Sequence, residues 1–491
     1  GTVLVSGLLG LALTRKNTTS GRSPDWGVGF LAAGLVAFTP LQIQLAHFFA
    51  VDSLLLFFVM LTLLACVQVV ESAHLTAWSV VAGVSYGLAM ATKFSALPLV
   101  VPLLIALYLR WRKRELDIQP SLFYLCCTCA LAGLIFFIAQ PYALLDWQNY
   151  ISQIVQQDEL VRGSVSVPYT IQFAGRVPFV YEAYNMVLWG MGVTLGVVSF
   201  AGLFWVAWRA FKREAGSWLV PLAWVLVYGG ITCTFYAKFM RYMLPVYPVL
   251  AVMGAAALFA FMRWLGQHYS ASSLFTKRLM PTLPTVLVTL VLVGTMFQGL
   301  ALLNVYSAPN TRVQASLWMY QHLPPGSVLT YEQWDDSLPV AVGSHTPSEY
   351  TQAAYIGTGG QTQTGLDLYG DDTTAKAHQL ATLLPTINAI TMATDRLDKS
   401  IPRLPQRYPL TIHYYQLLFS GQLGFHLAAQ FDNRPHLLGI TLNDSGADES
   451  YSVFDHPTVR IFVRDTPYPY TPDQLYQKLL AGVQLPVSQA P

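Results

Sequence analysis

Residues 47–53, HFFAVDS, lie between two long apolar runs and decide how the rest of the chain is interpreted. The first run is WGVGFLAAGLVAFTPLQIQLA at 26–46, and the second is SLLLFFVMLTLLACVQVV at 53–70. A helix needs roughly 20 apolar residues to cross a bilayer, and each run is about that long. His47 and Asp52 are therefore predicted to lie at a membrane surface, on one short connection between two membrane helices.

Two interpretations of Asp52 remain open from the local sequence. Ionisable side chains in a membrane protein are costly and usually functional, which favours a site residue. Aspartate is also common at the start of a helix, where its carboxylate stabilises the unpaired N–H groups. The residues around Asp52 do not separate these two roles.

The composition indicates a polytopic membrane protein. Of 491 residues, 54% are hydrophobic and only 11% are charged, whereas soluble proteins contain about 25% charged residues. The mean hydropathy is +0.43. The net charge of +2 gives no reason to expect a nucleic acid partner. Apolar runs that predict about ten spans occur at 1–13, 26–46, 53–70, 77–92, 95–109, 121–139, 183–208, 217–236, 243–264 and 283–304.

Basic clusters alternate with these runs and set the orientation. Crossing by crossing, four clusters fall on one side of the membrane, which the positive-inside rule makes the cytoplasm. The polar region after residue 304 then falls outside, so we expect a multi-pass protein of the cell (inner) membrane with an extracytoplasmic C-terminal domain. The cytoplasmic clusters are Arg15, Lys16 and Arg22; Arg110, Arg112, Lys113 and Arg114; Arg209, Lys212 and Arg213; and Arg263, Lys277 and Arg278.

Three basic residues lie on the predicted outer side, where the positive-inside rule predicts few of them. They are Lys93 in ATKFSALP and Lys238 and Arg241 in YAKFMRYMLPVYP. Lysine and arginine bind phosphate through their charge, and arginine adds a bidentate fork. Lys238 and Arg241 are three residues apart and are predicted to share one helical face. An anionic ligand explains them, and the alternative is a side chain that extends from the membrane to the interface.

The loop at 140–182 mixes aromatic, glycine, proline and charged residues, which suits either a membrane interface or a sugar-binding platform. Asp158, Glu159 and Arg162 within it are either ligand contacts or a solvated helical turn. The five cysteines all lie in apolar runs, so they predict packing rather than a disulfide framework or a metal cluster.

Residues 305–491 change character and predict a small α/β domain, separate from a transmembrane domain at 1–304. The acidic stretch YEQWDD, with Glu332, Asp335 and Asp336, suggests a solvated turn, or alternatively a metal or saccharide contact. Helices are predicted at 312–322, 373–384, 412–420 and 472–482, and strands at 328–331, 388–392, 424–431, 451–455 and 458–463.

Several phrases together resemble the family 39 glycosyltransferases, the protein-mannosyltransferase type with a GT-C fold. The resemblance covers most of 1–304 and rests on LQIQLAHFFAVDSLLLFFVMLTL, GLAMATKFSALPL, QPYALLD, VPYTIQFAGRVPF and KFMRYMLPVYPVLAV. It implies an inverting transfer of a sugar from a polyprenyl-phosphate carrier in the membrane lipid to an extracytoplasmic acceptor, whether protein, lipid or glycan. It implies no certain cofactor or metal site, although a divalent cation is a candidate.

By position, the resemblance makes Asp52 the catalytic candidate, on the second external loop of the family. The family's general base lies on the first external loop, which we expect upstream of Gly1, because Gly1–Leu13 is short for a span and no initiator Met is present. His47, Lys93, Lys238, Arg241, Tyr242 and Glu159 are the predicted substrate-binding residues. The alternatives are a non-catalytic assembly or flippase-associated protein of the same fold, and a transporter, although no internal repeat supports the latter.

Overall fold

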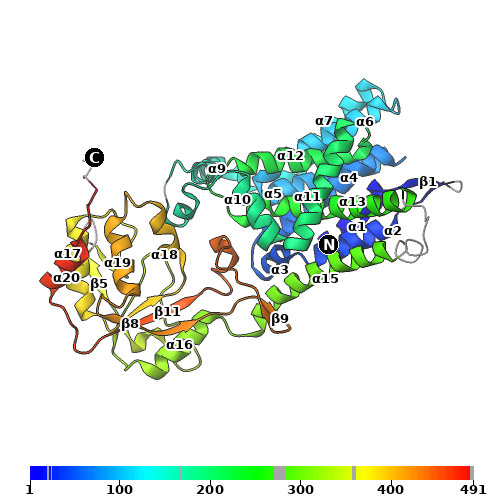
Figure 1. Ribbon diagram of the computed structural model, residues 1–491. Helices are drawn as coiled ribbons and strands as arrows, with labels where there is room; N and C mark the ends of the chain where they lie inside the picture. The colour runs from blue at the N-terminus through cyan, green and yellow to red at the C-terminus, as the bar shows by residue number, and fades with distance from the viewer. Residues whose placement is uncertain (19–20, 24, 166, 269–281, 357–360, 487–491) are drawn as a thin grey trace. The chain divides into compact units, whose positions relative to one another are not determined.

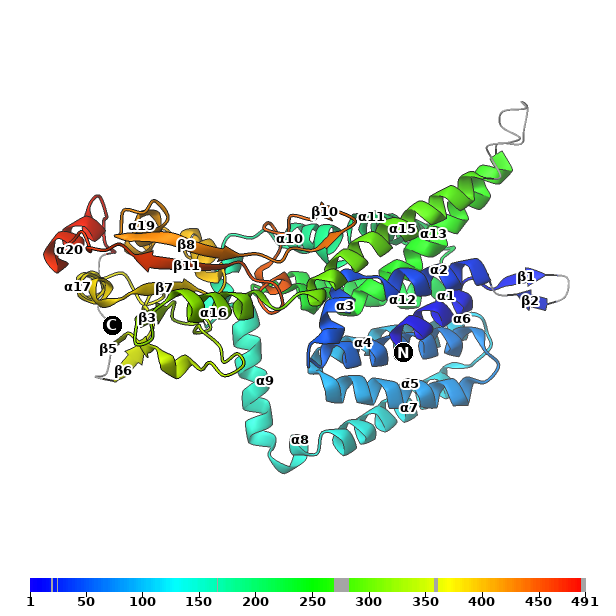
Figure 2. The ribbon, with the colours of Figure 1, turned by 90° about the horizontal axis from the view of Figure 1, so that it is seen from below.

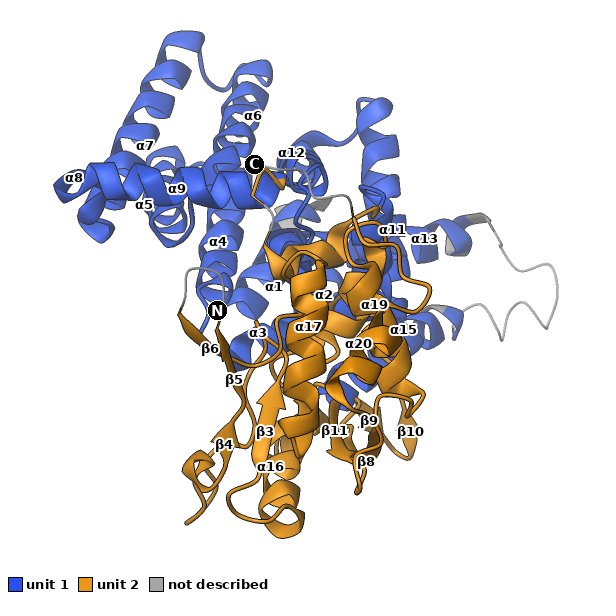
Figure 3. Cartoon of the chain, turned by 90° about the vertical axis from the view of Figure 1, so that its left-hand side faces the viewer, with its two compact units in different colours: residues 1–162, 177–303 blue, residues 163–176, 304–491 orange. Residues whose placement is uncertain are grey.

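The computed structural model describes residues 1–18, 21–23, 25–165, 167–268, 282–356 and 361–486. The chain forms two compact units, coloured separately in Figure 3. Unit 1 contains residues 1–162 and 177–303, and unit 2 contains 163–176 and 304–491. The predicted basic residues Lys277 and Arg278 lie outside the described residues.

Unit 1 is helical apart from one short hairpin (Figure 1). Its elements are α1 Thr2–Leu13, β1 Lys16–Thr18, β2 Gly21–Ser23, α2 Trp26–Ala37, α3 Pro40–His47, α4 Asp52–Glu71, α5 Leu75–Thr92, η1 Phe94–Leu99, α6 Val100–Arg112, α7 Ile118–Ala139, α8 Tyr142–Leu145, α9 Trp147–Arg162, α10 Val180–Asn185, η3 Met186–Gly190, α11 Val193–Phe211, η4 Gly216–Trp218, α12 Leu219–Cys233, η5 Met240–Val246, α13 Tyr247–His268 and α15 Leu283–Leu303.

Each of the ten predicted apolar runs contains an apolar helix. Within the described ranges, eight helices are long and apolar enough to cross a membrane, and the pair α2 and α3 counts as a ninth. That pair bends by 53°, because Pro40 opens α3 and forces Thr39 into an extended conformation. The first run is the shorter apolar helix α1. The predicted fold class, a mostly helical polytopic membrane protein followed by a small α/β region, is confirmed.

Glycines allow the longest helices to pack closely. In Figure 2, α4, α5 and α7 lie in a row, in agreement with their contacts. A Cβ atom on Gly87 of α5 would lie 2.5 Å from the carbonyl oxygen of Ala132 in α7. A Cβ atom on Gly202 of α11 would lie 2.4 Å from the backbone nitrogen of Gly254 in α13. Small residues at such crossings let helix backbones approach in a membrane.

Unit 2 is built on a five-stranded sheet in the order β4-β3-β7-β11-β8. Strand β3 pairs in parallel with β4 and β7, whereas β11 pairs antiparallel with β7 and β8. The elements are η2 Pro168–Phe173, η6 Asn304–Ser307, α16 Thr311–His322, β3 Val328–Tyr331, η7 Pro347–Glu349, β4 Thr351–Gln352, β5 Ala354–Ile356, β6 Thr362–Thr364, α17 Thr374–Leu383, η8 Leu384–Thr386, β7 Ala389–Met392, α18 Arg396–Ser400, η9 Ile401–Arg403, α19 Pro409–Phe419, β8 Phe425–Phe431, β9 His436–Leu437, β10 Ile440–Thr441, η10 Glu449–Tyr451, β11 Val459–Arg464 and α20 Pro472–Leu480.

Successive side chains of a strand point to opposite faces of the sheet. Neighbouring residues of unit 2 strands therefore join two different hydrophobic cores. Ile390 and Phe462 join the larger core with α17, α19 and α20. Ala389 and Ile461, their neighbours in sequence, join the smaller core with α16. The sheet is therefore covered on both faces, which gives unit 2 a hydrophobic core of its own.

The predicted strand at 451–455 is wrong. This segment forms η10 and a turn, because the side chain of Asp448 accepts hydrogen bonds from the main chain and hydroxyl of Ser450. Next to it, His456 is buried between Asp455, 2.6 Å from Nδ1, and Asp444, 2.8 Å from Nε2. Burial alone would lower the pKa of His456. The two hydrogen bonds to the aspartates outweigh this effect and raise the pKa to about 9. The segment is therefore fixed by side-chain contacts that hydrophobic periodicity does not report.

The acidic stretch 332–336 is not the solvated turn that the sequence suggests. Glu332 is 1% exposed and accepts a 2.5 Å hydrogen bond from the hydroxyl of Tyr415. Burial raises the pKa of its carboxyl well above the usual value. Asp335 accepts a hydrogen bond from Thr394, whereas Asp336 is exposed. Glu332 therefore belongs to the interior of unit 2, and Asp335 is half-buried.

Candidate active site

Asp52 lies in the first turn of α4 and is 4% exposed. The N-cap of this helix is Val51, and it makes no side-chain capping hydrogen bond. The carboxylate of Asp52 instead accepts a hydrogen bond from Nζ of Lys93 at 3.1 Å through Oδ1. Its second oxygen, Oδ2, accepts no hydrogen bond from the described residues. Of the two interpretations of Asp52, the geometry favours a site residue that also lies in the favourable field of the helix N-terminus.

Lys93 connects Asp52 to the segment η5. It ends α5 in an extended conformation, and its side chain is 33% exposed. The ammonium nitrogen lies 5.3 Å from the ring centroid of Tyr242. The guanidinium carbon of Arg241 lies 5.9 Å from the same centroid and 5.7 Å from that of Phe239. Two cations from separate chain segments thus lie near the ring of Tyr242, and one of them, Lys93, joins this ring to the carboxylate of Asp52.

Two side chains of α12 hold η5 in place. The indole of Trp224 donates to the carbonyl of Pro245 at 2.9 Å, and the hydroxyl of Tyr228 donates to the carbonyl of Tyr242 at 2.9 Å. These two rings stack with centroids 4.5 Å apart. Buried hydrogen bonds of this kind fix the orientation of a segment that is not a regular α-helix. The position of Arg241 and Tyr242 therefore depends on two residues of α12 that are about one helix turn apart.

Arg241 is the cation that is available to a ligand. Its side chain is exposed, and within the described ranges it forms no ion pair or hydrogen bond. A guanidinium group carries five N–H donors in a fork that matches two phosphate oxygens. The stacking contacts with Phe239 and Tyr242 orient this fork without using its donors.

The structure differs from the sequence analysis at Lys238. This residue lies in the irregular segment between α12 and η5, so it does not share a helical face with Arg241. Its ammonium donates to Oε1 of Glu182 at 2.8 Å and to the carbonyls of Cys233 and Phe235 at 2.9 and 2.7 Å. A lysine has three N–H donors, and these contacts use all three. Lys238 and Glu182 have side chains that are each 3% exposed, so the pair fixes this segment. The substrate-binding role of Lys238 stays a prediction.

His47 lies at the end of α3, and Glu159 lies on α9. His47 is exposed at the end of α3, with Nδ1 2.7 Å from the carbonyl oxygen of Ile43 in its own helix. Glu159 is exposed on α9, in the turn where Asp158 and Arg162 form an ion pair of 2.7 Å. A solvated helical turn therefore describes this part of α9, and the substrate-binding role of both residues stays a prediction.

Two features of the site were missed from the sequence. Glu182, the partner of Lys238, stands within the apolar stretch VPFVYEAYN, where a lone acid is itself a signal for a buried pair. Tyr228 has no such signal, because an aromatic residue in an apolar run also suits packing. Among the described residues, no group of three or more histidine, cysteine or acidic side chains could hold a metal ion.

Comparisons with known proteins cover the part of the site that contains Asp52 and Lys93. Residues 19–139, which are 121 of the 491 residues, match the family model described as dolichyl-phosphate-mannose-protein mannosyltransferase. This stretch includes Asp52 and Lys93 but not Arg241 or Tyr242. No curated protein matches the chain.

Two solved structures match parts of the chain. One is an oligosaccharyltransferase from Archaeoglobus fulgidus tethered with an acceptor peptide, at 13% identity over 94% of this chain and 76% of that chain, with a TM-score of 0.47. The other is ArnT from Cupriavidus metallidurans bound to undecaprenyl phosphate, at 16% identity over 68% of each chain, with a TM-score of 0.38. Over residues 19–139, the family match confirms the resemblance of this chain to membrane glycosyltransferases of the protein-mannosyltransferase type.

Proposed function

We propose that the chain transfers a sugar from a polyprenyl-phosphate donor to an acceptor outside the cytoplasm, with inversion at the sugar. The observation that carries this proposal is the cluster of Asp52, Lys93, Arg241 and Tyr242. It combines a carboxylate that retains an unpaired oxygen with an exposed guanidinium, at one end of apolar helices. The family description of residues 19–139 names a phosphate-linked sugar donor, which is the substrate class that such a cluster suits.

The chemistry requires two charges at separate positions. The acceptor hydroxyl forms a new bond to the anomeric carbon while the bond from that carbon to the phosphate oxygen breaks. The hydroxyl proton passes to a carboxylate, and the phosphate leaves with the bonding electron pair. Asp52 is the proposed carboxylate on the acceptor side, in place of the first-loop base that the family resemblance implies. Its Oδ2 faces the hydroxyl, and its Oδ1 is paired with Lys93. Arg241 is the proposed ligand of the departing phosphate.

Replacing Arg241 with lysine should raise the KM for the donor by roughly tenfold or more, because the charge stays but the bidentate fork is lost. The measurement is steady-state transfer from radiolabelled polyprenyl-phosphate mannose, the first donor to be tried, in reconstituted membranes. The matched control is Arg162→Lys on α9, which alters an exposed ion pair and should leave the KM unchanged. An Arg241→Lys variant with the parental KM would place the phosphate contact elsewhere.

The proposed topology places unit 2 outside the cytoplasm. Ser337 is exposed, so a cysteine there should react with a membrane-impermeant maleimide in intact cells. The background is a variant in which the five native cysteines, all in unit 1, are replaced. A cysteine at Glu115, exposed between α6 and α7, is the control and should react only after permeabilisation. The reverse labelling pattern would overturn the topology and the outer location of the site.

A further inference from the structure

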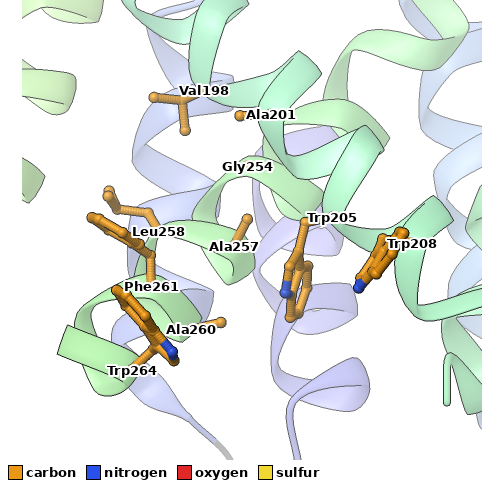
Figure 4. A pocket seen from close by; sticks show the side chains of 10 residues that line it. All are labelled: Val198, Ala201, Trp205, Trp208, Gly254, Ala257, Leu258, Ala260, Phe261 and Trp264. Atoms are coloured by element: carbon orange, nitrogen blue, oxygen red, sulfur yellow. The ribbon is translucent and has the colours of Figure 1, made fainter. Parts of the chain in front are cut away.

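Unit 1 contains an apolar groove between α11 and α13 that the proposed reaction does not use. Its volume is about 560 Å³. Figure 4 shows Trp205 and Trp208 lining it from α11, and Leu258, Phe261 and Trp264 lining it from α13. The side chains of Trp208, Phe261 and Trp264 are 59%, 48% and 47% exposed. Because α11 and α13 are long and apolar enough to cross a membrane, an apolar groove between them is open to lipid chains.

The shape of the groove follows from the glycine crossing. Gly202 and Gly254 bring the backbones of α11 and α13 into contact. Beyond that point both helices continue toward the ends that carry basic residues, where bulky tryptophans replace the glycines. The floor between the aromatic walls consists of small side chains, which are Ala201, Ala257 and Ala260. An apolar groove lined by aromatic and small side chains can accommodate a hydrocarbon chain.

Two cations lie over the aromatic wall of the groove. The guanidinium carbon of Arg209 lies 5.2 Å from the ring centroid of Trp205, and Nζ of Lys212 lies 5.0 Å from that of Trp208. Each is one helical turn beyond the indole that it covers. Arg209 donates one hydrogen bond to the carbonyl of Glu214. Neither Arg209 nor Lys212 forms an ion pair within the described residues. On α13 the charge of Arg263 is neutralised by Asp25 at 2.8 Å.

We propose that this groove binds an anionic phospholipid, with one acyl chain between the tryptophan and phenylalanine walls and the phosphate at Arg209 and Lys212. The charge of the rim and the apolar character of the slot are complementary to a molecule that carries a phosphate at one end of a hydrocarbon chain. By the positive-inside rule, this end of α11 lies in the cytoplasmic leaflet. The lipid site is therefore separate from the outer cluster around Asp52.

Photochemical labelling in nanodiscs tests the proposal. The full chain is placed in phosphatidylcholine containing a trace of phosphatidylglycerol with a photoreactive group in its acyl chain, and adducts are mapped by peptide analysis. Adducts should concentrate on 193–211 and 247–268. Since each basic side chain strengthens the binding of an anionic lipid by roughly fivefold, the double variant Arg209→Gln, Lys212→Gln should reduce them by about tenfold or more. The same variant should leave labelling by a photoreactive phosphatidylcholine unchanged.

Matched variants separate the groove from the general lipid surface. Arg112→Gln with Arg114→Gln removes the same charge from the end of α6 and the turn after it and should leave labelling of α11 and α13 intact. Ala257→Trp fills the groove floor and should lower adducts of both probes, whereas Val197→Trp, on an exposed part of α11 outside the lining, should not. Equal labelling in the parent and the Arg209, Lys212 variant would overturn the proposal. An equal fall of both lipid probes in that variant, or a crosslink to a second copy at these peptides, would also overturn it.

Discussion

An Asp52→Asn variant is expected to fold and to lose sugar transfer by about 100-fold or more. Asparagine has nearly the same volume as aspartate, so the buried first turn of α4 keeps its packing. It lacks the negative charge, so it cannot take up the acceptor proton, and acid–base catalysis of this kind contributes roughly 10²–10⁴-fold. Lys93 would lose its ion-pair partner, but its side chain is 33% exposed, so water can solvate the ammonium.

The measurement is kcat for transfer, compared with the melting temperature of the same preparation. Asp146→Asn is the matched control, because Asp146 is an exposed acid that accepts a hydrogen bond from Asn149 and lies outside the cluster. A loss of kcat without a loss of stability supports catalysis by Asp52. Asparagine caps helices about as well as aspartate, so activity near that of the parent would leave only a role at the start of α4.

The membrane helices could be predicted from the sequence because a single property decides them. A run of about 20 apolar residues has few alternatives to a helix in a bilayer, and all ten runs contain one. The sequence also placed Asp52 and Lys93 on the same side of the membrane. Their 3.1 Å contact could not be predicted, because it depends on how the start of α4 packs against the end of α5.

Lys238 shows where local reasoning fails. The spacing of Lys238 and Arg241 suits a shared helical face, but the segment before η5 is irregular. The carbonyl of Val161 accepts hydrogen bonds from the main-chain nitrogens of Tyr236 and Ala237 at 2.8 and 3.1 Å. This contact joins segments about 75 residues apart, and no periodicity within either segment reports it. Residues 451–455 were misassigned for a similar reason, because short-range side-chain contacts fix a turn where the apolar pattern favours a strand.

Replacing Lys238 with methionine should destabilise unit 1 by about 3–5 kcal/mol, which is the cost of removing one partner from a buried ion pair. The substitution leaves Glu182 with its charge but without the cation, and it leaves the carbonyls of Cys233 and Phe235 without their donor. The melting temperature in detergent measures this loss. Arg241→Met is the matched control: it removes an exposed cation, so it should weaken donor use while the melting temperature stays nearly unchanged.

The double variant Lys238→Met, Glu182→Gln then separates a structural role from a direct contact with the phosphate. A neutral glutamine costs less to bury than an unpaired carboxylate, so the double variant should recover part of the stability that the single variant loses. Donor use should recover with it, because in this account the pair only positions the segment that carries Arg241 and Tyr242. If Lys238 instead contacts the phosphate, the double variant regains stability but not donor affinity. That result would assign Lys238 to the donor-binding site. The melting temperature and the KM therefore move together in one case and separately in the other.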